Sequence, residues 1–221
     1  MVGWPNDRRF RMGIGVGARV QVEVEPLHPY LLRLYGVSEA EFEALADEDL
    51  KAEYLDGMMM VHSPASVRHE DRQIFLATLL KFHVDSHPPG RVLGGNALFR
   101  VGTRRFAPDV MVVREVGRVG PKEVEGPPDL AIEILSESTR DYDLGEKRMA
   151  YREVGIPEIW WVDLERQTVI VERRDRSYQA EAVAEGWVVS EVVPGFRIRA
   201  EWLWQEPLPS VVQCWGEMQG G

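Results

Sequence analysis

The chain has 221 residues, of which 44% are hydrophobic and 28% charged, so it is long enough to form one sizeable core of the ordinary globular kind. Its net charge of −10 argues against a broadly basic nucleic-acid-binding surface, so any contact with DNA must be local. The single cysteine, Cys214, excludes an intramolecular disulfide, and the lack of a long apolar stretch or apolar leader leads us to expect a cytoplasmic protein.

The N-terminal region predicts an arm followed by a helix. Residues 1–36 are rich in glycine and proline and show no clean periodicity, so we expect a partly irregular N-terminal arm. Ser38 and Glu41 have the spacing of a capping box, which predicts a helix over residues 37–49. This helix opens a single expected domain over residues 37–200, with a C-terminal tail at 201–221.

A hairpin and a long helix are predicted next. Residues 52–55 and 58–61 flank Asp56-Gly57, which is a strong signal for a two-residue β-turn. Residues 66–87 then form the longest predicted helix, apolar over a wide arc and therefore expected to be largely buried.

The second half of the chain alternates strands with one helix. Strands are predicted in six segments: 91–93, 97–101, 109–113, 129–135, 158–163 and 168–174. The helix is predicted over residues 143–154, with Asp143 and Glu146 in capping-box spacing and Gly155 at its end. Further antiparallel strands are expected to about residue 199. The pattern predicts an α/β (α+β) fold in which helices flank a mixed sheet.

Two acidic residues interrupt strands that should be buried. Asp109 opens an apolar run over residues 109–113, and Glu133 lies within another over residues 130–135. An ionised carboxylate in such a run costs several kcal/mol unless a cation or hydrogen-bond donors compensate it. Two such acids on neighbouring strands indicate a metal site.

A lysine on the following helix points to the same place. Leu144, Lys147, Tyr151 and Val154 share one helical face, and Lys147 is the charged residue on it. Only four lysines occur beside 22 arginines, so each lysine merits inspection. The alternative interpretation is that Lys147 extends past an apolar rim to solvent, while the two acids pair with buried arginines as purely structural groups.

Magnesium suits the two acids better than zinc. Mg²⁺ retains several waters and takes one or two protein carboxylates together with substrate phosphate oxygens, and Mn²⁺ is a plausible substitute. The five histidines show no zinc-binding spacing. The sequence also lacks a phosphate-binding glycine loop with its lysine and a serine-hydrolase nucleophile motif.

The order of these motifs resembles a known family. The matching segments are Pro108-Asp109-Val110, residues 128–136, Asp143, Lys147, Tyr151 and residues 155–163, with residues 53–57 and His69 upstream. Together they are similar to the Uma-type family of putative restriction endonucleases, within the PD-(D/E)XK nuclease superfamily. The resemblance implies a restriction-endonuclease-like core with added antiparallel hairpins. It also implies a metal held by Asp109 and Glu133, with Glu53 as an additional acid.

One position departs from the superfamily pattern. The usual lysine lies two residues after the second acid, where this chain has Leu135. The resemblance implies that Lys147 replaces it from the following helix. Further candidates for contacts around the metal site or with DNA are His69, Arg105, Arg140 and Tyr151, although a structural role for His69 and a solvated surface for the arginines are alternatives.

The implied activity is metal-assisted hydrolysis of phosphodiester bonds in DNA by a homo-oligomer, most plausibly a dimer. Catalysis is assigned to Asp109, Glu133, Lys147 and Glu53. Lys147→Ala should then abolish cleavage with little effect on folding, whereas Arg148→Ala should matter less. Two alternatives stay open: a non-catalytic nucleic-acid- or protein-binding scaffold on the same fold, and a metal-dependent phosphoesterase acting on RNA or nucleotides.

Overall fold

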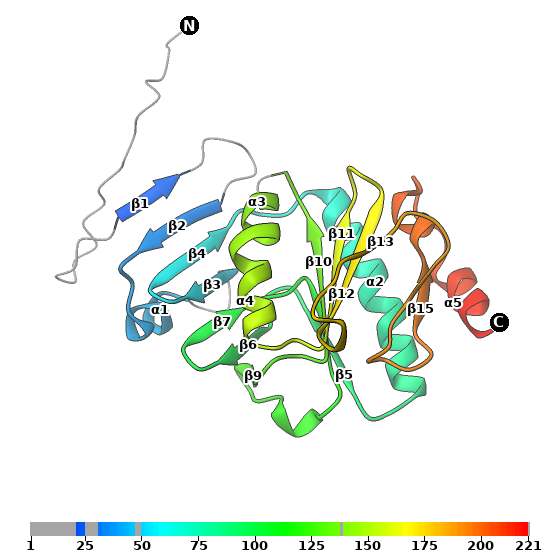
Figure 1. Ribbon diagram of the computed structural model, residues 1–221, viewed down its shortest axis with the longest axis horizontal. Helices are drawn as coiled ribbons and strands as arrows, with labels where there is room; N and C mark the ends of the chain where they lie inside the picture. Colours follow the sequence, from blue (N-terminus) through cyan, green and yellow to red (C-terminus); the bar gives the residue numbers. More distant parts are fainter. Residues whose placement is uncertain (1–20, 25–30, 47–49, 138, 221) are drawn as a thin grey trace, which may run out of the picture.

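Two mixed β-sheets form the frame of the protein in the computed structural model (Figure 1), which describes residues 21–24, 31–46, 50–137 and 139–220. The strands of the seven-stranded sheet, in spatial order, are β1 (Gln21–Val24), β2 (Leu31–Tyr35), β4 (Met58–His62), β3 (Ala52–Leu55), β7 (Arg104–Phe106), β6 (Leu98–Val101) and β9 (Glu123–Glu125). Those of the six-stranded sheet are β13 (Glu181–Val183), β12 (Thr168–Arg173), β11 (Glu158–Asp163), β10 (Leu130–Leu135), β8 (Val110–Val113) and β5 (Arg91–Gly94). A small pair comprises β14 (Trp187–Val189) and β15 (Arg197–Arg199).

The helices join and cover these sheets. They are α1 (Glu39–Leu45), α2 (Val67–Ser86), α3 (Arg140–Tyr142), α4 (Arg148–Glu153) and α5 (Val211–Gln219). A π-helical segment, η2 (Asp143–Lys147), connects α3 to α4, and short 3₁₀ segments are η1 (Val116–Arg118), η3 (Arg174–Arg176) and η4 (Ala200–Trp204). None of the helices in the described ranges is long and apolar enough to cross a membrane.

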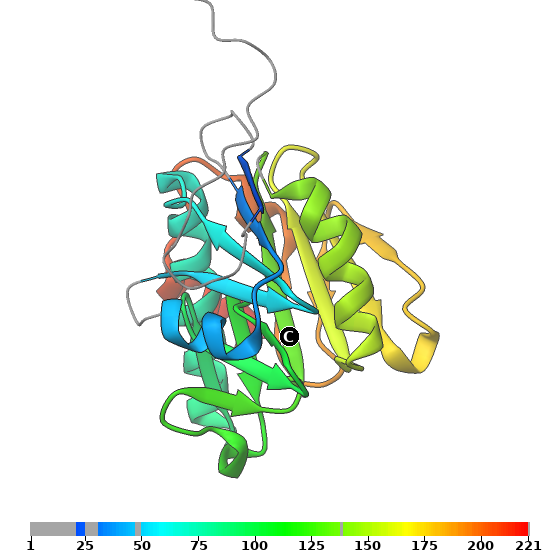
Figure 2. The same ribbon diagram turned by 90° about the vertical axis from the view of Figure 1, so that its left-hand side faces the viewer.

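The six-stranded sheet separates two apolar cores. Leu130, Ile132 and Ile134 of β10 pack toward α2, whereas Ala131 and Leu135 pack toward α4 and the seven-stranded sheet. This split follows from the two-residue period of a strand. Figure 2 shows α2 and α4 on opposite sides of this sheet. The helical segment between β10 and β11 joins two parallel strands, as parallel pairing requires.

Several local predictions are confirmed. Ser38 and Glu41 form the expected capping box of α1, and the hairpin turns at Asp56 and Gly57, which both have positive φ. Gly155, at φ +79°, follows the end of α4. The mixed fold with flanking helices and antiparallel hairpins is also as predicted.

Other predictions are wrong or incomplete. The helix predicted from residue 143 begins at Arg140, so Asp143 lies inside the helical segment and does not cap it. The long helix is less buried than expected, since Ile74 is 62% and Phe82 43% exposed. Strand β2 lies within the expected N-terminal arm, most of which falls outside the described residues, and α5 lies within the expected tail and packs on α2.

Candidate active site

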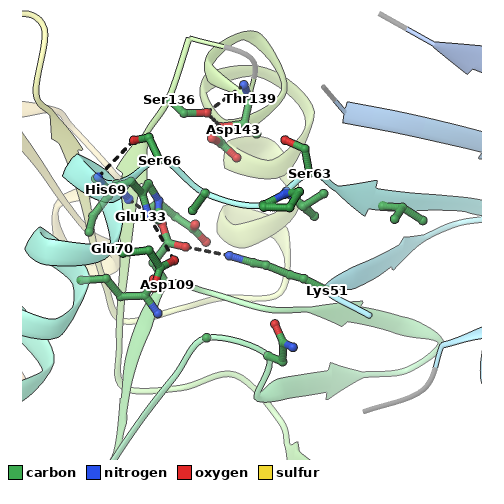
Figure 3. A pocket seen from close by; sticks show the side chains of 18 of the residues that line it. Lys51, Ser63, Ser66, His69, Glu70, Asp109, Glu133, Ser136, Thr139 and Asp143 are labelled. Atoms are coloured by element: carbon green, nitrogen blue, oxygen red, sulfur yellow. Dashed lines mark hydrogen bonds and ion pairs between the residues drawn. The ribbon is translucent and has the colours of Figure 1, made fainter. Parts of the chain in front are cut away.

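A cleft of about 790 Å³ opens where the end of β10 meets the start of α2 and the helical segment that begins at α3. Its walls include Asp109, Glu133, Lys51 and His69, which are labelled in Figure 3, and also Lys147. The side chains therefore come from both sheets and from two helical segments. Only the packing of these elements brings them together.

Sheet register places the two acids next to each other. Strands β8 and β10 are antiparallel, with Ile132 opposite Val110, so continuing the register by one residue brings Glu133 beside Asp109. The backbone N–H of Ile134 donates a hydrogen bond of 2.8 Å to Oδ2 of Asp109, which ties the acid to the neighbouring strand. Both carboxylates line the cleft.

Asp109 is buried among donors and cations. Nζ of Lys51 lies 2.7 Å from its Oδ1, and Nε2 of His69 lies 3.1 Å from its Oδ2. Burial by itself would raise the pKa of Asp109, but the positive charge of Lys51 and the hydrogen bond from His69 outweigh it and hold that pKa well below its usual range. Asp109 is therefore ionised at neutral pH.

The contact with Asp109 also changes the pKa of His69. Burial disfavours its charged form, yet the hydrogen bond and the charge of Asp109 dominate and raise the pKa of His69. Since an ionised carboxylate can only accept, Nε2 of His69 carries the proton in this contact.

Lys147 is buried between acids. Its Nζ lies 2.8 Å from Oε1 of Glu133, 2.9 Å from Oε1 of Glu53 and 3.9 Å from Oδ1 of Asp143. Only 1% of the Lys147 side chain is exposed. Burial opposes its charge, but the three carboxylates raise the pKa of Lys147 well above the ordinary value, so the side chain is an ammonium group.

The pKa of Glu133 is shifted upward, in the direction opposite to that of Asp109. Burial, together with the charges of Asp109, Asp143 and Glu53, raises the pKa of Glu133 to about 8, although Lys147 counteracts this. The hydroxyl of Tyr151 also donates a hydrogen bond to Oε1 of Glu133. At neutral pH Glu133 is therefore mostly protonated, because burial and the surrounding acids outweigh the charge of Lys147.

Glu53 lies beneath the cleft and is fully buried. It accepts hydrogen bonds from the backbone N–H of Ala107 at 2.9 Å and from the hydroxyl of Tyr142 at 3.1 Å, and it lies 3.1 Å from Nε2 of His62. Although burial favours its neutral form, Lys147 and His62 hold the pKa of Glu53 well below its usual range. Glu53 therefore fixes Lys147 from the side away from the cleft.

The balance of charge fits a bound cation. Four buried carboxyl groups, those of Glu53, Asp109, Glu133 and Asp143, share the two ammonium groups of Lys51 and Lys147, and burial together with this shortage of positive charge raises the pKa of Glu133 and of Asp143. Among the described residues, no group of three or more His, Cys, Asp and Glu side chains is arranged to hold a metal by itself. A zinc site would need such a group, whereas Mg²⁺ needs only one or two carboxylates with waters and phosphate oxygens. The residues present fit magnesium.

Comparison with known proteins identifies the family. The model of a family described as putative restriction endonuclease, Uma2, matches residues 39–201, which is well over half of the chain. The chain belongs to the Uma2 family. A search of curated proteins finds no match to this chain.

A solved structure shares the Uma2 chain's fold. It is a putative nuclease belonging to DUF820 from Anabaena variabilis, with a TM-score of 0.66 and 20% sequence identity. The match covers 76% of this chain and 97% of that one. At this identity the likeness shows the fold alone.

In this Uma2 chain Lys147 lies beside Glu133, as the sequence predicts. Leu135 lies on the same side of β10 as Glu133 and packs with Met111, Ala131 and Tyr151, so an apolar side chain fills the position where the superfamily carries its lysine. Lys147 reaches Glu133 from the helical segment instead. Its neighbour Arg148 points elsewhere and pairs with Glu172.

Two arginine candidates are not in the cleft wall. Arg105 is 2% exposed and forms ion pairs with Glu39, Glu43 and Glu123. Arg140 pairs with Asp163 at 2.6 Å. Their guanidinium groups are engaged by carboxylates of the protein, so the expected contacts with DNA are not favoured.

Two cleft residues escaped the sequence argument. Lys51 is one of only four lysines and lies two residues before Glu53, so strand alternation would have placed both on one face. Asp143 was assigned to a helix cap, although it is four residues before Lys147 and so on the same helical face. The small number of lysines could have indicated Lys51, and the helical spacing from Lys147 could have indicated Asp143.

Proposed function

We propose that this protein is a metal-dependent endonuclease that hydrolyses phosphodiester bonds in DNA. The observation that carries the proposal is the pair of buried acids, Asp109 and Glu133, side by side in a cleft where carboxylates outnumber ammonium groups. Membership of a family of putative restriction endonucleases supports the same conclusion.

Asp109 and Glu133 would hold Mg²⁺, with Mn²⁺ as a substitute. When bound, such an ion lowers the pKa of a coordinated water and offsets negative charge on the scissile phosphate. The low pKa of Asp109 keeps this carboxylate ready as a ligand at neutral pH. Glu133 exchanges its proton near pH 8 and would ionise fully once a cation adds positive charge nearby.

Lys147 would act on the substrate. Its ammonium is held in one position by Glu53, Glu133 and the ring of Tyr151, whose centroid lies 5.6 Å from Nζ. A fixed positive charge stabilises the negative oxygens that develop on phosphorus in the transition state, because it needs no reorganisation during the reaction. His69 and Tyr151 would position the two carboxylates by hydrogen bonds.

A dimer would suit cleavage of both strands, since each chain carries one such cleft and a two-fold axis matches the symmetry of duplex DNA. The net charge of −10 predicts that DNA affinity depends on a local contact region and on the divalent ion that masks the acids.

The test is nuclease assays on plasmid DNA, single-stranded DNA and RNA, each with Mg²⁺, Mn²⁺ or EDTA. We expect nicking and linearisation of plasmid with either ion, none with EDTA, and none by Asp109→Asn. Lys81→Met is a matched control, because Lys81 lies on the exposed side of α2 and pairs only with Asp85 among the contacts described. Cleavage of RNA alone would favour a phosphoesterase, and no cleavage of any substrate would favour a binding scaffold.

A further inference from the structure

The two oxygens of Asp109 are not equivalent. Oδ2 accepts from the backbone N–H of Ile134 at 2.8 Å and from Nε2 of His69 at 3.1 Å. A carboxylate oxygen offers two lone pairs, so these two donors use the capacity of Oδ2. Oδ1 is contacted by Nζ of Lys51 at 2.7 Å. A metal ion that binds Asp109 is therefore expected at Oδ1, the oxygen that Lys51 contacts and whose second lone pair has no donor among the described residues.

The two lysines of the cleft differ in their freedom to move. Lys147 is 1% exposed and lies among three carboxylates, whereas the side chain of Lys51 is 24% exposed and, among the described residues, pairs with one carboxylate, that of Asp109. Lys51 approaches Asp109 across the cleft from the start of β3 (Figure 3). Its four-carbon stem can swing without disturbing the core.

We propose that Lys51 is a displaceable counter-ion of Asp109, which a divalent ion expels and which then binds a phosphate of the nucleic-acid substrate in the cleft. This inference rests on the proposed function. Two cations on one carboxylate oxygen repel each other, so a metal ion at Oδ1 weakens the Lys51–Asp109 contact and favours release of the lysine. The substrate would bring a phosphate group into the cleft, and the released ammonium of Lys51 could bind this phosphate as a point charge.

The proposal couples the metal to the substrate. The ammonium of Lys51 would be released from Asp109 only when the metal is bound, so the metal-bound protein would present one more unpaired positive charge to DNA. The competing interpretation is that Lys51 stays on Asp109 as a fixed structural counter-ion. The two interpretations differ in the metal affinity of Lys51 variants and in their DNA affinity.

The first measurement is Mn²⁺ binding by titration calorimetry, without nucleic acid. Lys51→Met removes the ammonium that competes with the metal for Asp109. We expect this variant to bind Mn²⁺ about ten-fold more tightly than wild type, which corresponds to about 1.4 kcal/mol of binding free energy. Lys51→Arg keeps the charge and can grip the carboxylate with two hydrogen bonds, so it should fold even if the methionine variant does not and should bind Mn²⁺ more weakly. Lys81→Met should match wild type. Equal Mn²⁺ affinity in wild type and the Lys51 variants would overturn the proposal.

The second measurement is binding of a fluorescently labelled DNA duplex with Ca²⁺ in place of Mg²⁺, at several salt concentrations. We expect Lys51→Met to bind DNA roughly five- to ten-fold more weakly, with the slope of log K against log salt reduced by about one, as for loss of one phosphate contact. Lys51→Arg should keep the slope. Unchanged DNA binding by Lys51→Met would overturn the substrate contact and leave Lys51 as a counter-ion only.

The outcomes separate this inference from the nuclease proposal. If wild type cleaves no substrate but Mn²⁺ affinity follows the order Met, Lys, Arg at position 51, the nuclease proposal fails and displacement stands. If wild type cleaves DNA while Mn²⁺ affinity is the same in all three, the nuclease proposal stands and displacement is wrong.

Discussion

Removing the charge of Lys147 should destabilise the folded protein, and the structure sets the size of the effect. Lys147→Met keeps the length of the side chain and its packing but leaves Glu53 and Glu133 without the ammonium that lies within 3 Å of both. Breaking a buried ion pair by removing one partner costs about 3–5 kcal/mol. The expectation from sequence, that loss of Lys147 leaves folding nearly intact, is therefore revised.

We expect the lower end of this range at pH 7, about 3 kcal/mol. Glu133 has a pKa of about 8, so at pH 7 it already carries its proton in wild type and keeps it in the variant, which leaves one ionised carboxylate, Glu53, to be compensated. That carboxylate, Glu53, retains hydrogen bonds from Ala107 and Tyr142 and its contact with His62. Above about pH 8 the loss should grow, because the variant holds the Glu133 proton to a higher pH than wild type and must be deprotonated at a greater cost.

The assay is urea unfolding at pH 7 and pH 9 in EDTA, which measures the free energy of unfolding without metal. Lys81→Met serves as the control, since its exposed pair with Asp85 should contribute only about 0.3–0.5 kcal/mol. A loss below about 1 kcal/mol for Lys147→Met at pH 7, or a loss that does not grow at pH 9, would refute the assignment of Lys147 as the cation that compensates these acids.

Three further outcomes are expected. Magnesium should raise the melting temperature of wild type but not of Asp109→Asn, and a shift that survives in the variant would place the metal elsewhere. Without metal, stability should fall as pH rises from about 4.5 to 8, because the raised pKa of Glu133 makes the folded state bind more protons than the unfolded state in that window; Glu133→Gln should flatten this slope in urea titrations. Arg148→Ala should cleave plasmid within about two-fold of wild type, since Arg148 pairs with Glu172 outside the cleft wall, and a loss near that of Lys147→Met would contradict this placement.

The sequence by itself determined the local structure around the site. The apolar runs indicated buried strands at the two acids, with Glu133 inside β10 and Asp109 directly before β8, and the hairpin turn at Asp56-Gly57 followed from the backbone preferences of its two residues. Helical periodicity put Lys147 and Tyr151 on one face, and both contact Glu133. These features depend on neighbours a few residues away, which is why periodicity was sufficient.

Only the tertiary structure decided which charges meet. Lys51 and Asp109 are 58 residues apart and directly precede strands of different sheets, β3 and β8, so no local pattern specifies their contact. Arg105, four residues before Asp109, is instead drawn away to carboxylates of α1 and β9. An ionic partner is selected by distance and burial in the folded chain, because Coulomb energy depends on separation in space and on the surrounding dielectric. The sequence could therefore indicate the acids and Lys147, whereas only packing determined that Lys51 is the cation that compensates Asp109.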